Sequence, residues 1–273
     1  MTIEAPAKVN LTLHVRGLRP DGFHDIESLM APLSLADRLE ISLQDTPGID
    51  FSCSDSSLPS DGSNLVCQAV EAFSQAIGHE FGVRIHLKKN IPHGAGLGGG
   101  SSDAAAVLKA LNELLGVGFS VEDLEKLAAS IGSDVPFFIR GVPATCRGRG
   151  ERIEPVAGIP GAEILLVKPP FPVSTAWAYG TWARTARLDE TSAPMFGSIL
   201  MVNDLEAPVF CKHLQLPVLK RWLASQPSVV AAMMSGSGST VFAVLNGADE
   251  DLGGRVREEF GKSFSVWRCR IVS

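Results

Sequence analysis

A glycine run that opens into a helix constrains the fold of this chain more than any other feature. Five of the seven residues from 94 to 100 are glycine, and glycine lets the backbone take positive φ and approach a ligand closely. The apolar positions that follow recur at helical spacing, which predicts a helix from about residues 101–103 to Gly116. Free N–H groups and the positive end of the helix dipole then converge on the run, so we expect it to bind a phosphate.

Three other interpretations of the run are weaker. A flexible linker before an ordinary Ser/Asp helix cap would not open directly into a strongly amphipathic helix. The spacing Gly94-x-Gly96-x-x-Gly99 matches a dinucleotide-binding pattern, but the preceding strand is predicted to end near Leu87, and that fingerprint needs the turn directly after the strand. The P-loop pattern needs a Lys before Ser or Thr, and the run has no such pair.

Composition and charge argue against several classes of protein. The 273 residues are 45% hydrophobic and 20% charged, which is a globular profile rather than a disordered one. With 24 Lys+Arg against 30 Asp+Glu, the net charge of −6 argues against binding of duplex nucleic acid. The five cysteines form no C-x-x-C pair, which argues against a thiolate zinc site and a dithiol redox centre and favours a reducing compartment.

Two segments bear on targeting and membranes. Residues 1–6 lack the basic and apolar regions of a signal peptide. The stretch Trp222–Ala248 carries no formal charge, but it contains Ser235-Gly236-Ser237-Gly238-Ser239-Thr240, which does not suit a lipid-facing helix. We predict two buried strands around a glycine loop there, and a soluble, cytoplasmic protein with no membrane partner.

Hydrophobic periodicity predicts an α+β chain. In the first half we expect alternating strands over residues 8–15, 39–43 and 83–87, a helix from residues 61–63 to Gly78, and a helix from Ser120 to Gly132 with Asp123 completing a capping box. The turn-rich segment Gly48–Asp61 is predicted to be a surface excursion. After Gly132, Ser133-Asp134-Val135-Pro136 leads into two phenylalanines.

The second half has the alternation of a ferredoxin-like domain. Low periodicity and two prolines in residues 155–162 predict a boundary that divides the chain into domains 1–157 and 158–273. Beyond it we expect strands at Ile164–Val167, Val229–Met234, Val241–Leu245 and Phe264–Val272, and helices at Ser174–Ala186, Leu205–Phe210 (interrupted by Pro208), Val218–Leu223 and Asp251–Phe260. Without one extra helical insert, the order is strand, helix, strand, strand, helix, strand.

Three polar positions could carry chemistry, although each has an ordinary structural explanation. Lys8 and Asn10 share one face of a strand, about 7 Å apart, and Lys8 alone could be a solvated strand lysine. Asp134 stands in apolar company, where a carboxylate needs a partner or a raised pKa, although it could be a simple turn residue. Phe23-His24 could stack on and hydrogen-bond a base, or be a core phenylalanine and a surface histidine.

Three motifs in order resemble those of the GHMP small-molecule kinases, over nearly the whole chain. They are Ala7-Lys8-Val9-Asn10-Leu11, Pro92-x-x-x-Gly96-Leu97-Gly98-Gly99-Gly100-Ser101-Ser102, and Ser235-Gly236-Ser237-Gly238-Ser239-Thr240. The resemblance implies a first half like domain 2 of ribosomal protein S5 and a ferredoxin-like second half. It also implies ATP as phosphoryl donor, with Mg²⁺ bound mainly through the ATP phosphates and no dedicated metal ligands from the protein. The ATP loop would comprise Pro92, His93, Gly94, Ala95, Gly96, Leu97, Gly98, Gly99, Gly100, Ser101 and Ser102.

Further motifs resemble one branch of this family, whose substrate is a cytidine-diphosphate-linked methylerythritol. They are Arg19-Pro20-Asp21-Gly22-Phe23-His24, Gly132-Ser133-Asp134-Val135-Pro136-Phe137, Gly148-Arg149-Gly150-Glu151 and Asn203-Asp204-Leu205-Glu206. The resemblance implies phosphorylation of the 2-hydroxyl of the methylerythritol, in the non-mevalonate route to isoprenoid precursors. The alternatives are a homoserine- or mevalonate-type kinase of the same family, and a non-catalytic ATP-binding regulator.

The same resemblance implies roles for individual residues. Asp134 would deprotonate the substrate hydroxyl, and Lys8 would keep Asp134 ionised and stabilise negative charge near the transferred group. Asn10 would position the substrate, and Thr175 would contact its diphosphate. Phe23 and Tyr179 would stack on the cytosine, and His24 would hydrogen-bond to the edge of that base. The family usually has tyrosine where Phe23 stands, so a hydroxyl is lost here. Asp103 is expected to cap the helix or to act indirectly on Mg²⁺, and 203–206 is left without a chemical role.

Overall fold

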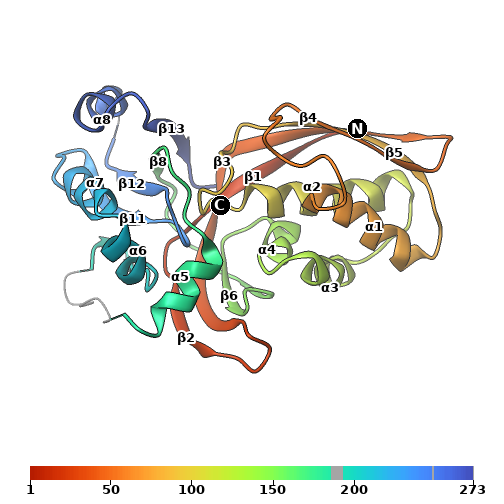
Figure 1. Cartoon of the computed structure of the whole chain (residues 1–273), viewed down its shortest axis with the longest axis horizontal. Coiled ribbons are helices and arrows are strands. Elements are labelled where there is room, and N and C mark those ends of the chain that lie inside the picture. Colours follow the sequence, from red (N-terminus) through yellow and green to blue (C-terminus); the bar gives the residue numbers. More distant parts are fainter. Residues whose placement is uncertain (186–192, 248, 273) are drawn as a thin grey trace.

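Two large sheets organise the chain, one in each half, and a small two-stranded sheet is added in the second half. The computed structural model describes residues 1–185, 193–247 and 249–272. A seven-stranded sheet with its helices forms the first half and a four-stranded sheet with its helices forms the second, side by side along the long axis of the molecule (Figure 1). Among the described residues, no helix is long and apolar enough to cross a membrane.

The first half contains seven strands and four helices among the described residues. Its elements are β1 (Thr2–Asn10), β2 (His14–Leu18), β3 (His24–Gln44), β4 (Gly48–Cys53), α1 (Leu65–Ile77), β5 (Gly82–Lys88), α2 (Gly99–Leu114), α3 (Val121–Ile131), α4 (Val135–Arg140), β6 (Ala144–Gly148) and β7 (Arg152–Pro155). The expected end of α1 at Gly78, in the left-handed region, and the capping box between Ser120 and Asp123 of α3 are confirmed. Helix α1 begins later than the predicted residues 61–63, because Asn64 is its N-cap and accepts the N–H of Val66.

The long strand β3 is the central strand of the first sheet. Its 21 residues pair with β1, β2, β5 and β6. Helices α1, α2 and α4 contribute to one core against this sheet, with Phe73, Leu108 and Phe137 fully enclosed. Helix α2 lies at the centre of this layer and buries nine of its residues, so the glycine run before it is held on a rigid element.

Two strand predictions in this half need correction. The strand expected over residues 8–15 breaks after Asn10, because the N–H groups of Leu11 and Thr12 both donate to the carbonyl of Leu29, and the N–H of Leu13 donates to Val202 of the second half. The excursion expected over Gly48–Asp61 begins with β4, which pairs in parallel with β5.

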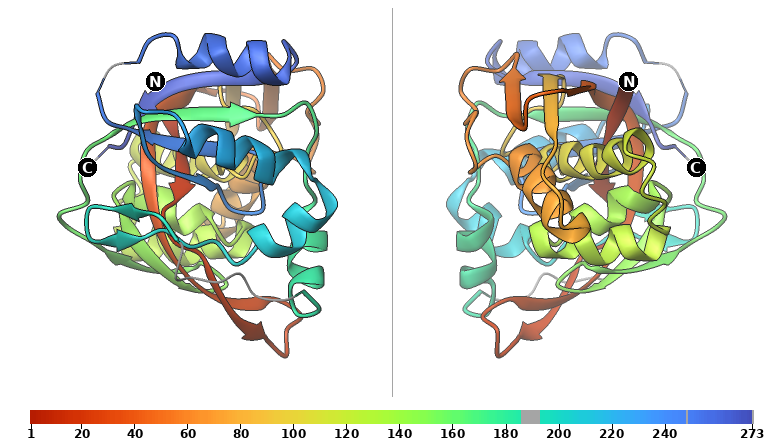
Figure 2. Two further views of the ribbon diagram at one scale, coloured as in Figure 1. Left: turned by 90° about the vertical axis from the view of Figure 1, so that its left-hand side faces the viewer. Right: turned by 90° about the vertical axis from the view of Figure 1, so that its right-hand side faces the viewer.

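The second half has the predicted ferredoxin-like sheet. Its elements are β8 (Glu163–Lys168), α5 (Thr175–Trp182), β9 (Met195–Phe196), β10 (Ile199–Leu200), α6 (Glu206–Lys212), α7 (Gln215–Ala224), β11 (Val229–Met234), β12 (Val241–Leu245), α8 (Leu252–Phe260) and β13 (Ser265–Arg270). The antiparallel order β11-β12-β8-β13 leaves α7 and α8 on the side away from the first half, as the end view also shows (Figure 2).

Two helix predictions here differ from the structure. Helix α6 continues through Pro208, because this proline is the third helical residue and its missing N–H would have no intrahelical partner. Helix α5 is shorter than expected, and the predicted end at Ala186 lies outside the described residues.

The halves share a hydrophobic core. One buried cluster combines Ala7, Val9 and Leu11 of the first half with Leu166 and Phe242 of the second. An isolated bridge also joins Leu33 to Ile271. The boundary predicted at residue 157 falls in the connection between β7 and β8, and the division into domains 1–157 and 158–273 stays a prediction.

Candidate active site

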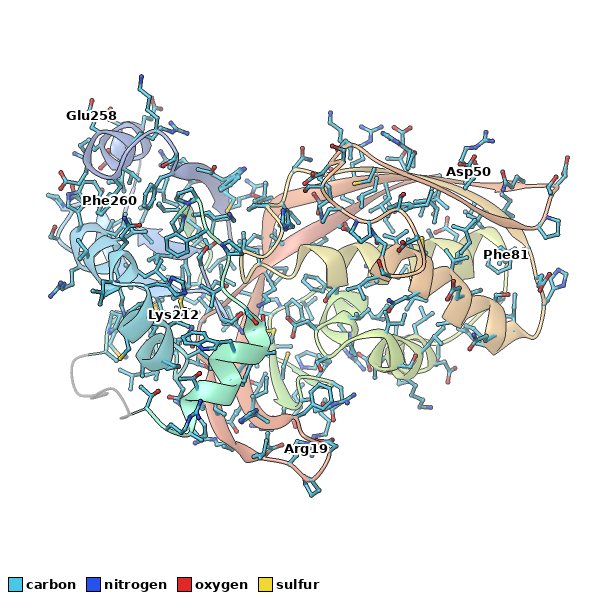
Figure 3. The ribbon with its side chains drawn as sticks, viewed as in Figure 1. Arg19, Asp50, Phe81, Lys212, Glu258 and Phe260 are labelled. Atoms are coloured by element: carbon cyan, nitrogen blue, oxygen red, sulfur yellow. The ribbon has the colours of Figure 1, made fainter. Side chains whose placement is uncertain are left out.

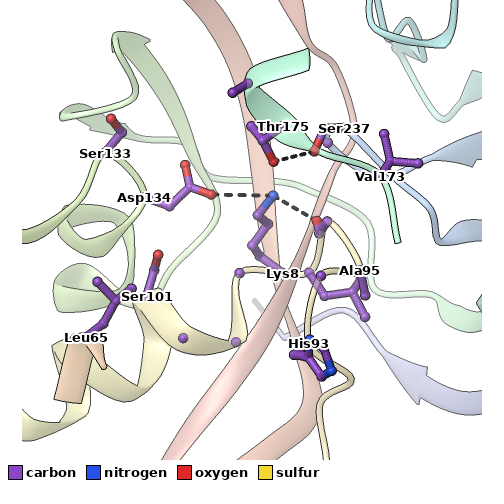
Figure 4. A pocket seen from close by; sticks show the side chains of 18 of the residues that line it. Lys8, Leu65, His93, Ala95, Ser101, Ser133, Asp134, Val173, Thr175 and Ser237 are labelled. Carbon is purple, nitrogen blue, oxygen red and sulfur yellow. Dashed lines mark hydrogen bonds and ion pairs between the residues drawn. The ribbon is translucent and has the colours of Figure 1, made fainter. Parts of the chain in front are cut away.

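A cavity of about 880 Å³ collects most of the predicted site residues from both halves. Strand β1, the glycine run with the start of α2, the residue before α4, helix α5 and the loop between β11 and β12 all contribute to its wall (Figure 4). Its lining includes Lys8, Asn10, Asp134, Thr175, Tyr179, Phe23, His24 and every residue from Pro92 to Ser101.

Lys8 is buried at the centre of this cavity and has three polar neighbours. Its side chain is 4% exposed, and its Nζ donates to Asn10 Oδ1 at 2.7 Å and to the carbonyl of Gly96 at 3.0 Å. The Oδ2 atom of Asp134 lies 3.7 Å from the same nitrogen (Figure 4). The expectation that Lys8 and Asn10 point to one side of a strand is confirmed.

Asp134 occupies the N-cap position of α4 but does not cap that helix. Its side chain makes no hydrogen bond to the first turn, and it points toward Lys8 with 32% of its surface exposed. The helix behind it is fixed by Val135, Pro136 and Phe137, all of which are buried. The carboxylate therefore has a rigid support, one cationic neighbour and an open side toward the cavity.

The glycine run packs against the second glycine loop, Ser235–Thr240. Gly94, Gly96 and Gly98 all have φ between +61° and +75°. A Cβ on Gly96 would lie 2.2 Å from the carbonyl oxygen of Ser235, so no larger residue fits there. The Ser235 hydroxyl donates to the carbonyl of Gly96 at 2.9 Å. The run is therefore an ordered loop, which excludes a flexible linker.

One predicted loop residue lies elsewhere. Helix α2 begins at Gly99, two residues before the expected start, so Ser102 and Asp103 are inside the helix and cannot cap it. Ser102 is buried and does not line the cavity, whereas Ser101 does. Within the described residues, the hydroxyl of Ser102 and the Oδ1 atom of Asp103 have no hydrogen-bond partner.

A buried charge cluster beneath the glycine run was missed by sequence reasoning. Lys89 Nζ contacts Asp37 and lies 2.8 Å from Asp103 Oδ2. Asp37 Oδ1 also accepts the N–H groups of Asn90 at 2.5 Å and Ile91 at 2.8 Å, which fixes the chain as it enters the run. Burial raises the pKa of Asp103 to about 7. No local pattern marks this cluster, because Asp37 and Lys89 lie beyond the predicted strands and come together only when β3 pairs with β5.

The segment 203–206, which had no predicted role, supports the second glycine loop. Asn203 Nδ2 donates to the carbonyls of Met234 at 2.7 Å and Gly236 at 2.8 Å. Glu206 accepts the N–H of Met234 at 2.9 Å and pairs with Lys220 at 2.6 Å, while its burial raises its pKa. These residues hold the loop whose Gly236–Gly238 stretch lines the cavity.

Aromatic side chains gather where helix α5 meets the β2–β3 hairpin, and we call this region the aromatic end of the cavity. The ring centroids of His24 and Tyr179 lie 5.3 Å apart with an interplanar angle of 33°, and His24 also meets Trp182 edge-on. Phe23 is 49% exposed beside the β2–β3 hairpin tip, which carries the labelled Arg19 (Figure 3). Thr175 Oγ1 lies 2.8 Å from the hydroxyl of Ser237.

Another part of the wall comes from the end of the predicted surface excursion and from the start of the helix that follows it. Leu58, Pro59 and Ser63, together with Asn64 and Leu65 at the start of α1, line the cavity there. Their mixture of apolar surface and side-chain polar groups suits a planar heterocycle. No chemical motif marks these residues, so sequence reasoning had no basis for placing them in the site.

Comparisons with known proteins agree with this geometry. Residues 64–142 match the family model for the N-terminal domain of GHMP kinases, and residues 185–266 match the model for their C-terminal domain. The chain is similar to the 4-diphosphocytidyl-2-C-methyl-D-erythritol kinase of Methylacidiphilum infernorum, with 48% identity over 90% of this chain and 86% of the relative. The enzyme of the same name from Geobacter metallireducens is 38% identical over 93% and 92% of the two chains.

Solved structures show the same relationship. A crystal structure of 4-(cytidine 5'-diphospho)-2C-methyl-D-erythritol kinase superposes with a TM-score of 0.81 at 36% identity, covering 100% of both chains. The homoserine kinase from Cytophaga hutchinsonii shares only the fold, with a TM-score of 0.70 at 18% identity over 100% of this chain and 94% of that one. The chain therefore belongs to the GHMP kinases, a family of ATP-dependent small-molecule kinases, and within them to the group of 4-diphosphocytidyl-2-C-methyl-D-erythritol kinases.

Proposed function

We propose that the chain transfers the γ-phosphoryl group of ATP to the 2-hydroxyl of 4-diphosphocytidyl-2-C-methyl-D-erythritol, in the non-mevalonate route to isoprenoid precursors. The observation that carries the proposal is the position of the Lys8–Asp134 pair. The pair lies in one cavity between a glycine loop suited to phosphates and an aromatic end suited to a base. The names of the relatives support the choice of substrate.

Asp134 acts as the general base. The carboxylate accepts the proton of the substrate hydroxyl as its oxygen attacks the γ-phosphorus; a new O–P bond forms, the bond to the bridging oxygen breaks, and ADP leaves. Phosphoryl transfer depends mainly on positioning and on compensation of charge. The neighbouring ammonium group of Lys8 and the rigid start of α4 suit Asp134 to this task.

Lys8 is the ion-pair partner of Asp134 and compensates charge near the transferred group. Its hydrogen bonds to Asn10 and to the carbonyl of Gly96 fix its ammonium group between the base and the phosphate loop. Asn10 is itself held by its Nδ2, which donates to Ser28 Oγ at 2.8 Å. Asn10 therefore orients both Lys8 and the hydroxyl-bearing end of the substrate.

The residues present fit Mg²⁺ as the companion of ATP. Asp103 presents a carboxylate oxygen without a partner among the described residues, and Ser101 adds a hydroxyl at the same wall. Hard oxygen donors of this kind suit Mg²⁺, which usually keeps several waters and binds mainly through phosphates. When bound, the ion would neutralise charge on the phosphate oxygens. These two residues would hold it.

The aromatic end binds the cytosine. Phe23 and Tyr179 supply stacking surfaces, and His24 supplies a hydrogen-bonding ring beside Tyr179. Loss of the tyrosine hydroxyl at position 23 leaves this stacking surface in place. Thr175, paired with Ser237, stands between the base and the glycine loops, where the diphosphate must pass.

Release of ADP from Mg-ATP tests the proposal. Turnover with the cytidine substrate, and none with mevalonate or homoserine, is the expected result. Turnover with either control instead would overturn the substrate assignment while keeping the kinase chemistry. Binding of ATP with no turnover of any of the three would overturn the catalytic roles of Lys8 and Asp134.

A further inference from the structure

One arginine that lines the cavity makes no direct ion pair with any carboxylate of the described residues. Among the cationic side chains that line it, Lys8 faces Asp134 and Lys89 contacts Asp37 and Asp103. Arg149 also lines the cavity, and within the described residues no carboxylate oxygen lies within 4 Å of its guanidinium. Its guanidinium therefore has no direct ion pair among the described residues, although its charge acts on the nearby carboxylate of Asp21.

The position of Arg149 is set by its neighbours. The backbone N–H of Arg149 donates to Glu151 Oε2 at 2.6 Å in the turn between β6 and β7. Its Cζ lies 4.5 Å from the centre of the Phe23 ring, a cation–π contact. The next residue, Gly150, borders the catalytic corner, because a Cβ there would lie 3.6 Å from Asp134 Oδ1. Arg149 thus stands between the base-binding end and the reacting groups.

We propose that Arg149 binds the diphosphate of the nucleotide-linked substrate, an assignment that rests on the proposed function. Between its base and its reacting hydroxyl, that substrate carries two phosphates whose charge must be met inside a partly closed cavity. A guanidinium offers a planar fork of N–H donors that matches phosphate oxygens, often in two parallel hydrogen bonds. Stacking on one face of Phe23 leaves the edge donors of Arg149 available and the other ring face open to the cytosine.

The assignment also gives the exposed Phe23 a second function. Its ring supports the guanidinium that reads the phosphates while it stacks on the base. Two residues in contact then recognise the substrate at the aromatic end of the cavity: Phe23 stacks on the base, and Arg149 binds the phosphates beside it.

A ligand series with increasing phosphate number tests the proposal. Binding of cytidine, CMP and CDP is measured by calorimetry for the wild type, Arg149→Gln and Arg149→Lys. We expect Arg149→Gln to weaken CDP about ten- to hundred-fold, the effect of losing charge-assisted hydrogen bonds, and to change cytidine less than two-fold. Arg149→Lys keeps the charge without the planar fork, so its affinity for CDP should lie between those of the wild type and Arg149→Gln. Arg152→Gln, an exposed neighbour in β7, is the matched control and should behave as wild type.

Steady-state kinetics separates phosphate binding from a structural role. We expect Arg149→Gln to raise KM for the cytidine substrate about ten-fold or more, with kcat and KM for ATP within two-fold of wild type. If Arg149→Gln weakens the binding of cytidine and CDP equally, Arg149 only supports Phe23 and the proposal is overturned. Unchanged CDP binding in this variant would also overturn it. The binding series is independent of turnover, so wild-type enzyme that fails to phosphorylate the substrate overturns the proposed function without deciding the role of Arg149.

Discussion

The carbonyl oxygen of Gly96 accepts a hydrogen bond from the Nζ of Lys8 at 3.0 Å. This contact joins the middle of the glycine run to the lysine that faces Asp134. The ammonium group therefore has a fixed position relative to both the phosphate loop and the base. A change at either residue should affect the alignment of donor and acceptor.

Removal of either member of the Lys8–Asp134 pair should abolish most turnover. We expect Asp134→Asn and Lys8→Ala each to lower kcat by roughly 10²- to 10⁴-fold, the usual contribution of a positioned general base and its partner. ATP binding and the circular dichroism spectrum should stay close to wild type. Turnover within a few-fold of wild type in either variant would contradict the assigned role.

Alanine at Gly96 tests the contact between the two glycine loops, with alanine at a glycine outside the cavity as its control. Gly96→Ala places a Cβ 2.2 Å from the Ser235 carbonyl oxygen at a φ of +75°, so the loop must move and ATP affinity should fall by more than ten-fold. Gly161→Ala lies outside the cavity, has no described atom within 4 Å of the added Cβ, and should bind ATP normally. Calorimetric titration with a non-hydrolysable ATP analogue measures both. Similar affinities for the two variants would show that the contact with Ser235 is unimportant.

The stacking role of Phe23 predicts a change in KM. We expect Phe23→Ala to raise KM for the cytidine substrate about five- to hundred-fold, since stacking of a base on an aromatic ring contributes about 1–3 kcal/mol. Phe23→Tyr keeps the ring and serves as the control, with KM near wild type. An unchanged KM in Phe23→Ala would exclude this ring as a base-stacking surface.

The buried Asp103 predicts a pH-dependent stability. Its folded pKa of about 7 lies above the ordinary value, so folding favours the protonated form. The stabilisation is complete below the unfolded pKa of about 3.8 and is lost as pH rises through 7. Without nucleotide or Mg²⁺, wild type should lose on the order of 2 kcal/mol of unfolding free energy relative to Asp103→Asn between pH 5 and pH 8.

Urea denaturation at four pH values measures the effect. Asp45→Asn removes an exposed carboxylate and is the control, with no such change relative to wild type. A constant difference between wild type and Asp103→Asn across this range would show that Asp103 is ionised throughout, held so by Lys89.

Local patterns predicted those parts of the site that depend on neighbouring residues. Period two placed Lys8 beside Asn10, and their side chains are hydrogen-bonded. The uncharged stretch around residues 229–245 was predicted as two strands around a glycine loop, and β11 and β12 have the predicted bounds. In both cases the controlling interactions lie within a few residues along the chain.

The features that were missed depend on partners distant in sequence. The strand over residues 8–15 breaks because Leu13 pairs with Val202, and β4 exists because it adds to β5. Asp37, Lys89 and Asp103 meet only after β3, β5 and α2 are packed. Arg149 is far in sequence from Phe23, and only the pairing of β3 with β6 brings their turns together.

Asn203 connects the two halves at a single residue, which has a consequence for recombining related enzymes. Its backbone bridges to Leu13, while its side chain holds the carbonyls of Met234 and Gly236. Consider a chimera that joins the first half of this chain to the second half of a relative. Its second glycine loop and the asparagine that supports that loop come from the same parent only if the crossover lies before Asn203. Placed after it, the exchange leaves two buried carbonyls dependent on a residue from the other parent.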